Sequence, residues 1–597
     1  MWRTVELLND IVISSDSSTI FPRWQTLLLS YLKTLTKFYL NFMKIKHLFM
    51  ALAIAVATVV TTSCEEEGPI VNKHPQPDPE EQEPGEQDPD AVFPEGAYYP
   101  EQIPTLDEYV GLPTPGAEEV YKPSKLLNMY KPIKVDRTSS NNRPVSSWTS
   151  EKTRILPYLT GFVRNENIET YKAKTNKYGS STEFAKQAAT GRFYVTKIGE
   201  RWWIVDPEGS LHYARSVCSF RKGGSERNAA AFAQRFASDA DWVATTQREL
   251  ADIGFHGTGA FSTNKNASDV IGYQAVQTHN AVNPGAPLTL APSFGLIGAF
   301  VSSIGDKVIN GETLRVCAVF HPDWPTYCET YAKADYGFGP YLRDKNVLGI
   351  FSHNEINFES SGGTKYLLQR ILAVSDKSHF AYKAAVEWCS KNNVSTTSPN
   401  KTDCQRFAGH VAELYYKGVK EGIQKADPYM LYLGTRLHGS PKYNDYIIAA
   451  AGKWCDIISI NYYSRWSPEL DSYVSKWATL ANKPFLVTEF YTKGMDVEEG
   501  AGGITNTSGA GFLVKTQRDR AYAYQHFTLG LLEAPNCVGW HWFKYQDDDG
   551  SDNSNEPANK GIYDNQMQPY PELLDAFKRT SDNIFGLIKH FDAKNNK

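Results

Sequence analysis

The sequence lacks the cysteine patterns that mark zinc sites and disulfide frameworks. It has 8 cysteines but no Cys-x-x-Cys pair, and no cysteine–histidine cluster has the spacing of a zinc site. With Cys64 set aside, the remaining cysteines are odd in number and widely spread, which is not the pattern of a disulfide-stapled fold. One or two bridges stay open, and Cys389 with Cys404 is the closest pair.

An excess of positive charge and a long apolar run are also missing. The net charge is −5, so the sequence offers no basic surface for nucleic acid or an anionic membrane. The apolar stretch 48–64 is interrupted by threonines and is short for a transmembrane helix. The 597 residues are 41% hydrophobic, enough for one large domain or two ordinary ones. Aromatic residues make up 13%, which suits either surfaces that stack on sugars or a large aromatic core.

The N-terminal part resembles a bacterial lipoprotein signal peptide. Basic residues follow Met43, then an apolar segment, then small residues before Cys64. The resemblance implies a signal peptide over about 43–63 and a lipid on Cys64, although Thr61 stands where lipoproteins usually have Leu. It predicts an outer membrane lipoprotein, on the cell surface or the periplasmic side, that touches the membrane only through its lipid. If Cys64 is lipidated, residues 1–42 are expected to be an upstream segment from a mis-assigned start. The alternative is an ordinary secretory signal with a nearby cysteine.

Three segments follow the signal. Residues 65–95 are rich in Pro, Glu, Asp and Gln and cannot bury enough apolar surface to fold, so they are predicted to form a disordered tether. Residues 96–190 lack sustained periodicity and are predicted to be an irregular flank. From Gly191 to about residue 590 short apolar strands alternate with helical stretches, beginning with a hairpin whose tip is at 198–200.

This alternation favours a (β/α)8 TIM barrel in the class of α/β proteins, with a doubly wound open sheet as the alternative. Apolar residues at helical spacing predict a helix that ends before Pro428. The third strand is the least clear, because 315–320 competes with 287–295. The expected strands are 211–219, 256–261, 287–295, 347–356, 430–439, 455–464, 484–492 and 537–545.

Two of these strands deliver a carboxylate at their ends. The run "VLGIFSHNEINF" reaches Glu355, and "KPFLVTEFY" reaches Glu489. In a closed barrel the carboxyl ends of the strands meet at one mouth, so the two side chains are expected to face each other. Two facing carboxyl groups are what glycoside cleavage requires, and a separation of ~5–5.5 Å gives retention of configuration.

"NE" at the end of strand four and "TEF" at the end of strand seven resemble clan A of the retaining glycoside hydrolases, over most of residues 190–580. The resemblance implies that Glu355 is the acid/base, Glu489 the nucleophile and Asn354 a ligand of the sugar 2-hydroxyl. The charge of Glu489 is expected to keep a proton on Glu355 until the covalent ester forms. No cofactor is needed for this chemistry.

Further side chains are candidates for substrate contact. Tyr462 or Tyr463 matches the tyrosine of the clan that bonds the nucleophile, and adjacent strand residues point in opposite directions, so only one can do so. A tryptophan on strand eight commonly forms the floor under the cleaved sugar, with a role in plugging the barrel as the alternative. The remaining candidates line the cleft or belong to the core: Trp540, His541, Trp542, Arg215, Arg436, His438 and Trp324.

Several phrases resemble the agarase branch, family fifty, including "ERWWIVDPEGSLHYARSV", "VFHPDWPTYCE" and "VGWHWFKYQD". One departure is His353, where an aspartate is expected before Asn354. The sequence therefore predicts a retaining β-glycoside hydrolase with a polysaccharide substrate, foremost an agarose-like galactan. Mannan, glucan and arabinogalactan are alternatives within the enzyme class. A non-catalytic glycan-binding lipoprotein and a purely structural one are alternatives outside it.

Overall fold

The structure of the chain is a computed structural model. It describes residues 131–136, 148–159, 162, 168–223, 225–262, 272–310, 314–359, 365–497, 503–506, 508–548 and 557–595. All of these residues belong to one compact unit, which lies within Gln87–Lys597. The predicted signal peptide, Cys64 with its predicted lipid, and the predicted tether lie outside the described residues. Among the described helices, none has the length and apolar character needed to cross a membrane.

The predicted hairpin is confirmed and forms a small antiparallel sheet. Strands β3 (Tyr194–Ile198), β4 (Arg201–Val205) and β5 (Leu211–His212) pair in this order. The Asp206 carboxylate accepts bonds from the backbone N–H groups of Glu208 and Ser210, which stabilises the turn between β4 and β5.

A six-stranded sheet, parallel throughout, forms the centre of the unit. Its order is β8-β7-β6-β13-β10-β9, so the first and last strands of the sequence series, β6 and β13, lie side by side. The strands span Ala214–Val217 (β6), Gly257–Thr258 (β7), Thr289–Leu290 (β8), Ile458–Asn461 (β9), Phe485–Glu489 (β10) and Cys537–Trp542 (β13).

Two further predicted strands connect the edges of this sheet. Parallel bridges join Leu290 to Val347, Ile350 to Tyr432, and Leu437 to Ile460. The segments around 347–351 and 432–437 therefore lie side by side between β8 and β9, the two edge strands of the sheet. They are held by isolated bridges instead of regular strand ladders, and the predicted extents 347–356 and 430–439 are longer than the paired residues.

Alternate residues of these segments meet in one buried cluster. Every strand-derived member is at most 7% exposed, and the cluster also takes in Phe193 and Ile204 from the hairpin sheet. The Trp202 N–H donates to the carbonyl of Pro535, just before β13 begins, so the hairpin sheet covers the amino ends of the strands. The strand-derived members are Ala214, Ala291, Leu348, Phe351, Leu431, Leu433, Ile457, Leu486 and Val538.

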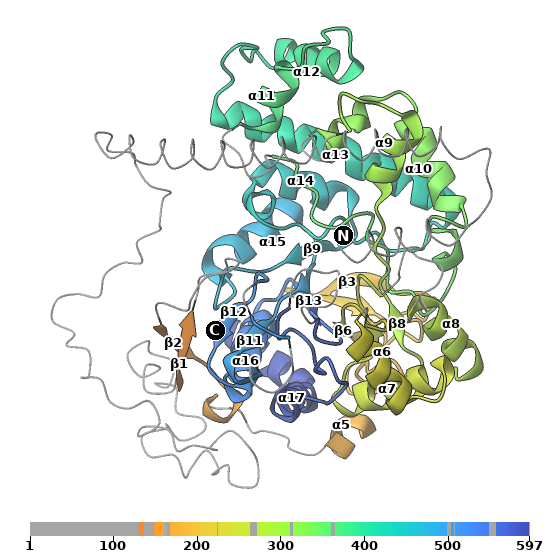
Figure 1. Cartoon of the computed structure of the whole chain (residues 1–597), viewed down its shortest axis with the longest axis vertical. Coiled ribbons are helices and arrows are strands. Elements are labelled where there is room, and N and C mark those ends of the chain that lie inside the picture. Colours follow the sequence, from red (N-terminus) through yellow and green to blue (C-terminus); the bar gives the residue numbers. More distant parts are fainter. Residues whose placement is uncertain are drawn as a thin grey trace, which may run out of the picture. The chain divides into compact units, whose positions relative to one another are not determined.

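Helices occupy the connections. They span Ile168–Ala173 (α5), Glu226–Arg235 (α6), Asp239–Asp252 (α7), Gly272–Val282 (α8), Leu296–Ile304 (α9), Trp324–Lys333 (α10), Leu367–Leu372 (α11), Phe380–Lys391 (α12), Lys401–Ala426 (α13), Asp445–Trp454 (α14), Ser475–Ala481 (α15), Gln517–Glu533 (α16) and Pro571–Asn595 (α17). Figure 1 shows α9 to α13 gathered at one end and α16 and α17 near the other. The segments 347–351 and 432–437, which form isolated bridges only, are separated in sequence by the long helical connection that holds α11, α12 and α13.

Helix α13 is the helix predicted from periodicity, and it ends before Asp427. Glycines on it allow α10 to approach closely. A Cβ on Gly418 would lie 2.5 Å from Nε1 of Trp324. Trp324 is 2% exposed in this contact, so it belongs to the helix–helix core and not to the cleft for which the sequence made it a candidate.

The third predicted strand, 287–295, contains β8, and its competitor Arg315–Phe320 forms a 3-10 helix. The expectation of an irregular flank needs correction. Part of the flank is regular: β1 (Lys131–Asp136) pairs with β2 (Thr149–Thr153) and with β12 (Phe512–Val514), which in turn pairs with β11 (Thr492–Gly494). All cysteines in the described part of the chain are buried and free, including Cys389 and Cys404.

Candidate active site

Glu489 is the last residue of β10, and its carboxylate is fully engaged. It is 6% exposed. Nη2 of Arg436 donates to Oε1 at 2.6 Å, and the hydroxyl of Tyr463 donates to Oε2 at 2.8 Å. Each carboxylate oxygen therefore has one strong donor, which fixes the plane of the carboxyl group.

Burial raises the pKa of Glu489 to about 7. The positive charge of Arg436 opposes this rise, the negative charge of Glu355 adds to it, and the hydrogen bonds from Tyr463 and Arg436 oppose it. The carboxyl group is thus balanced between its neutral and ionised forms near neutral pH.

Glu355 follows the segment 347–351 and turns out of it sharply. Its φ is +52°, in the left-handed region that non-glycine residues rarely adopt, and its N–H donates to the carbonyl of Thr435 at 2.9 Å. Its side chain is 32% exposed, far more than that of Glu489. Oε1 accepts a 2.7 Å hydrogen bond from Nδ2 of Asn461, and Nδ1 of His438 lies 4.0 Å from the same oxygen. A carboxyl group at this position can reach a substrate and water.

Two residues connect the carboxylates. Asn461 pairs in register with Glu489 across β9 and β10, while its side chain reaches Glu355. The Arg436 guanidinium donates from Nη1 to Oδ1 of Asn354 at 2.8 Å and from Nη2 to Glu489. Glu355, Asn354 and Glu489 are thereby brought to one site, at the carboxyl ends of their segments.

Arg436 is completely buried and also has a left-handed backbone, with φ +56°. Its N–H donates to Oγ of Ser459, and Nη2 donates to the carbonyl of Thr488 at 3.0 Å. The guanidinium also lies over the ring of Phe261, 4.9 Å from its centroid. A buried cation with this many partners is a fixed part of the site and cannot swing away from Glu489.

The geometry decides between the two candidate tyrosines. Tyr463 contacts Glu489, whereas the Tyr462 hydroxyl lies on the other side of the strand end and donates to Oε2 of Glu469 at 3.1 Å. The Tyr462 oxygen also accepts the N–H of Glu469 at 2.9 Å. Tyr462 therefore supports the loop after β9, not the carboxylate pair.

The strand-eight tryptophans present no free ring face. Trp540 is fully buried, and its Nε1 donates to the hydroxyl of Tyr524 on α16 at 3.1 Å. Trp542 is 1% exposed; its Nε1 donates to the carbonyl of Lys560, and its ring packs edge-on against Phe490. Neither ring is available as a floor for a sugar, because both fill the space between the sheet and the covering helices.

Arg215 and His541 also lie away from any accessible surface. Nη2 of Arg215 donates to the hydroxyl of Tyr171 at 2.7 Å and to the carbonyl of Gly179, so it belongs to the packing of α5 on the sheet. His541 is fully buried, and burial lowers its pKa to about 3. A Cβ on Gly259 would lie 2.8 Å from Nδ1 of His541, so the imidazole packs directly on that backbone.

Sequence reasoning missed Asn461 and Thr488. Asn461 is the last residue of β9, and a polar residue that ends an apolar strand was the same signal that identified both glutamates.

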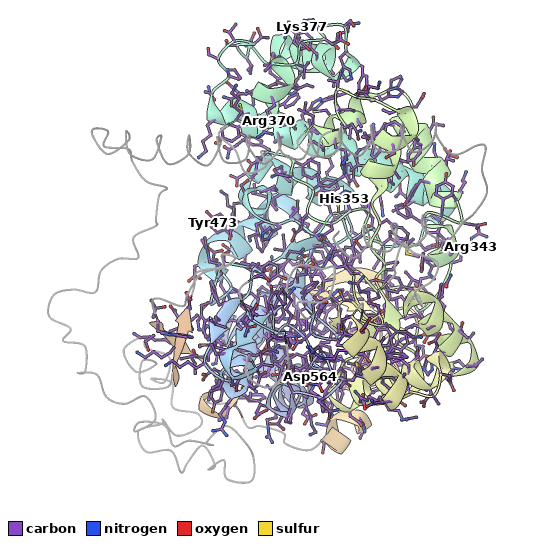
Figure 2. The ribbon with its side chains drawn as sticks, in the orientation of Figure 1. Arg343, His353, Arg370, Lys377, Tyr473 and Asp564 are labelled. Atoms are coloured by element: carbon purple, nitrogen blue, oxygen red, sulfur yellow. The ribbon has the colours of Figure 1, made fainter. Side chains whose placement is uncertain are left out.

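Figure 2 labels His353, which directly precedes Asn354 and lies between the group of helices around α13 and the rest of the unit. Among the described residues, no group of three or more His, Cys, Asp or Glu side chains could hold a metal ion.

No protein-family model matches the chain. Beta-agarase B of Vibrio sp. (strain JT0107) is 26% identical over 492 residues, which cover 69% of this chain and 50% of that protein. Beta-agarase A of the same organism is 27% identical over 300 residues, covering 49% of this chain and 27% of that protein. The chain thus spans half the length, or less, of these two relatives.

Solved structures give a closer match. An exo-beta-agarase structure is 18% identical with a TM-score of 0.53, covers 71% of both chains, and supports the fold alone. The crystal structure of BpGH50 is 43% identical with a TM-score of 0.70, and the match covers 78% of this chain and 96% of that one. On this similarity, the chain belongs to glycoside hydrolase family 50.

Proposed function

We propose that the protein is a retaining β-glycoside hydrolase that cleaves an agarose-like β-galactan by double displacement. The observation that carries the proposal is the joint placement of Glu489, held by Arg436 and Tyr463, and Glu355, linked to it through Asn461. The substrate class rests on the similarity to two beta-agarases.

In the proposed architecture, the parallel circuit of strands is a (β/α)8 barrel of the clan A type. The six-stranded sheet and the four parallel bridges between Leu290 and Ile460 support it, because every neighbouring pair around the circuit is joined. Both glutamates follow the carboxyl ends of their segments, which is where sites of such barrels lie.

In the first step, Glu489 attacks the anomeric carbon while Glu355 gives its proton to the leaving oxygen. The Arg436 and Tyr463 donors orient the attacking carboxylate, and formation of the ester removes its negative charge. In the second step Glu355 accepts a proton from water, which attacks the ester and releases the sugar with retained configuration. Asn354 binds the hydroxyl next to the reacting carbon.

The experiment is product analysis after incubation with agarose, porphyran and mannan. Mass spectrometry should show oligosaccharides from agarose, and proton NMR of the first products should show the β-anomer before mutarotation. If oligosaccharides were released from mannan alone, the substrate would be a mannan and not an agarose-like galactan. Binding to a glycan without cleavage of any would favour the non-catalytic lipoprotein instead.

For localisation, we propose that Cys64 carries a lipid and anchors the enzyme to the outer membrane. The support is the signal-like segment 43–63 before that cysteine. Cys64→Ser should move the protein from the membrane fraction to the soluble fraction of cells without changing its activity per mole. Unchanged fractionation would overturn the anchor.

A further inference from the structure

The amide of Asn461 uses nearly all of its hydrogen-bonding capacity within the candidate site. Nδ2 donates to Oε1 of Glu355 at 2.7 Å and to Oδ1 of Asn354 at 3.3 Å. Oδ1 accepts the hydroxyl of Thr488 at 2.8 Å. Asn461 is completely buried, so no solvent competes for these bonds.

Asn354 and Thr488 together orient the amide. The guanidinium of Arg436 has only donors, so Oδ1 of Asn354 is the atom that faces it, and Asn461 turns its nitrogen toward that oxygen and toward Glu355. The oxygen of Asn461 then faces Thr488, whose hydroxyl donates to it. Thr488 is also fully buried, directly before Glu489 on β10. The strand that carries one carboxylate therefore orients the amide that contacts the other.

We propose that Asn461 is a positioning residue that makes Oε2 of Glu355 the proton-transferring oxygen. This rests on the proposed function, in which Glu355 is the acid/base. An oxygen that accepts an N–H donor is the favoured carbonyl oxygen of a protonated carboxyl group, so Oε1 stays unprotonated and the proton sits on Oε2.

The proton balance follows from this assignment. In the first step the Oε2–H bond breaks and the proton passes to the glycosidic oxygen, whose bond to the anomeric carbon breaks as Glu489 forms the ester. In the second step water gives a proton back to Oε2 as its oxygen bonds to the anomeric carbon, and the ester bond from that carbon to Glu489 breaks, which returns Glu489 as a carboxylate. Throughout both steps Asn461 keeps Oε1 fixed and exchanges no proton.

The test compares Asn461→Ala and Thr488→Val with wild type, and Thr488→Ser serves as the conservative variant. Two substrates are used: an agarose oligosaccharide and the dinitrophenyl glycoside of the smallest product. The oligosaccharide has a poor leaving group and needs the acid, whereas dinitrophenolate leaves without protonation. Thermal unfolding of each variant checks that it is folded.

We expect kcat/KM on the oligosaccharide to fall about 10- to 100-fold in Asn461→Ala, since a hydrogen bond to a carboxyl group and part of the acid function are lost. The loss on the dinitrophenyl substrate should be several times smaller. Thr488→Val should show the same selective loss of kcat/KM on the oligosaccharide, but a smaller one. Thr488→Ser keeps the hydroxyl group and should bring kcat/KM back toward the wild-type value.

Equal losses on both substrates, or no loss in a folded variant, would overturn the role of Asn461 while leaving the proposed function in place. If Asn461→Ala does not fold, Thr488→Val alone decides, and a non-selective loss there has the same meaning. A wild-type protein that cleaves neither substrate would overturn the proposed function, and the assignment of Oε2 with it.

Discussion

Tyr463 donates a hydrogen bond of 2.8 Å to Oε2 of Glu489, and the two residues are only 5% and 6% exposed. The adjacent Tyr462 gives its hydroxyl to Glu469 instead. These two adjacent tyrosines have the same side chain but different hydrogen-bond partners. Replacing each by phenylalanine therefore gives a matched pair of variants.

Tyr463→Phe should lower kcat/KM by about 10- to 100-fold, because a hydrogen bond to a charged group contributes roughly 1.5–3 kcal/mol. Tyr462→Phe should leave kcat/KM close to wild type and reduce the free energy of unfolding by about 1 kcal/mol. Steady-state kinetics and urea unfolding measure the two effects. Equal kinetic losses in both variants would contradict the assignment of Tyr463.

Glu489→Ala should abolish turnover while largely keeping affinity for the polysaccharide, since the nucleophile is lost but the rest of the cleft remains. Affinity electrophoresis in agarose gels measures binding, and reducing-end release measures turnover. Glu329→Gln is the control, because Glu329 pairs with Lys333 and Lys425 on the helix surface. Near-normal activity of Glu489→Ala would remove the residue from its role.

The pH dependence of kcat/KM should have an acid limb near pH 7. Burial raises the pKa of Glu489 to about 7, and only the ionised carboxylate attacks, so the rate should fall as the pH drops below that value. The limb should not depend on the leaving group. A flat profile between pH 5 and about pH 8 would show that another group controls the rate.

Arg436→Met should move that acid limb to higher pH and lower the maximal rate. The guanidinium favours the ionised form of Glu489, so the pKa of the carboxyl group rises when the charge is removed. Arg370→Met provides the control, because Arg370 lies on α11, in the upper group of helices (Figure 2), where it donates to the backbone carbonyl of Lys365. An unshifted limb in a folded Arg436→Met variant would contradict the electrostatic coupling.

Gly452→Ala should destabilise the fold by about 1–3 kcal/mol, as overpacking does. A Cβ on Gly452 would lie 2.4 Å from Cα of Ala481, so α14 and α15 would have to separate. Urea unfolding measures the change, and activity per folded molecule should stay constant. Gly285→Ala, where a Cβ would meet nothing within 4 Å, is the control and should change little.

The parts of the fold that sequence predicted are those where one apolar run maps onto one strand. Strand β10 carries five buried residues in a row that end at Glu489, and β13 six that end at Trp542, so their existence followed from composition. The segment before Glu355 was found for the same reason, yet it forms bridges only. Its regularity depends on long helical connections that no local pattern encodes.

The direction of side chains was the part that sequence could not give. Tyr462 and Tyr463 alternate correctly, but which one faces the carboxylates depends on the bend after β9. Trp540 and Trp542 have the residue type of a sugar platform, and only their contacts with Tyr524 and Lys560 place them behind the sheet. Asn461 also ends an apolar strand, but its side chain is an amide, and the search at strand ends was for carboxyl groups.

The buried sulfhydryl groups have a practical consequence. Every cysteine from Cys218 to Cys537 in the described residues is unlinked and shielded from solvent. In a Cys64→Ser variant, a maleimide probe should therefore label the native protein very slowly and the denatured chain at once. The labelling rate then reports how often the part of the molecule that holds these cysteines opens, and none of these cysteines requires an oxidant to return to its native state after denaturation.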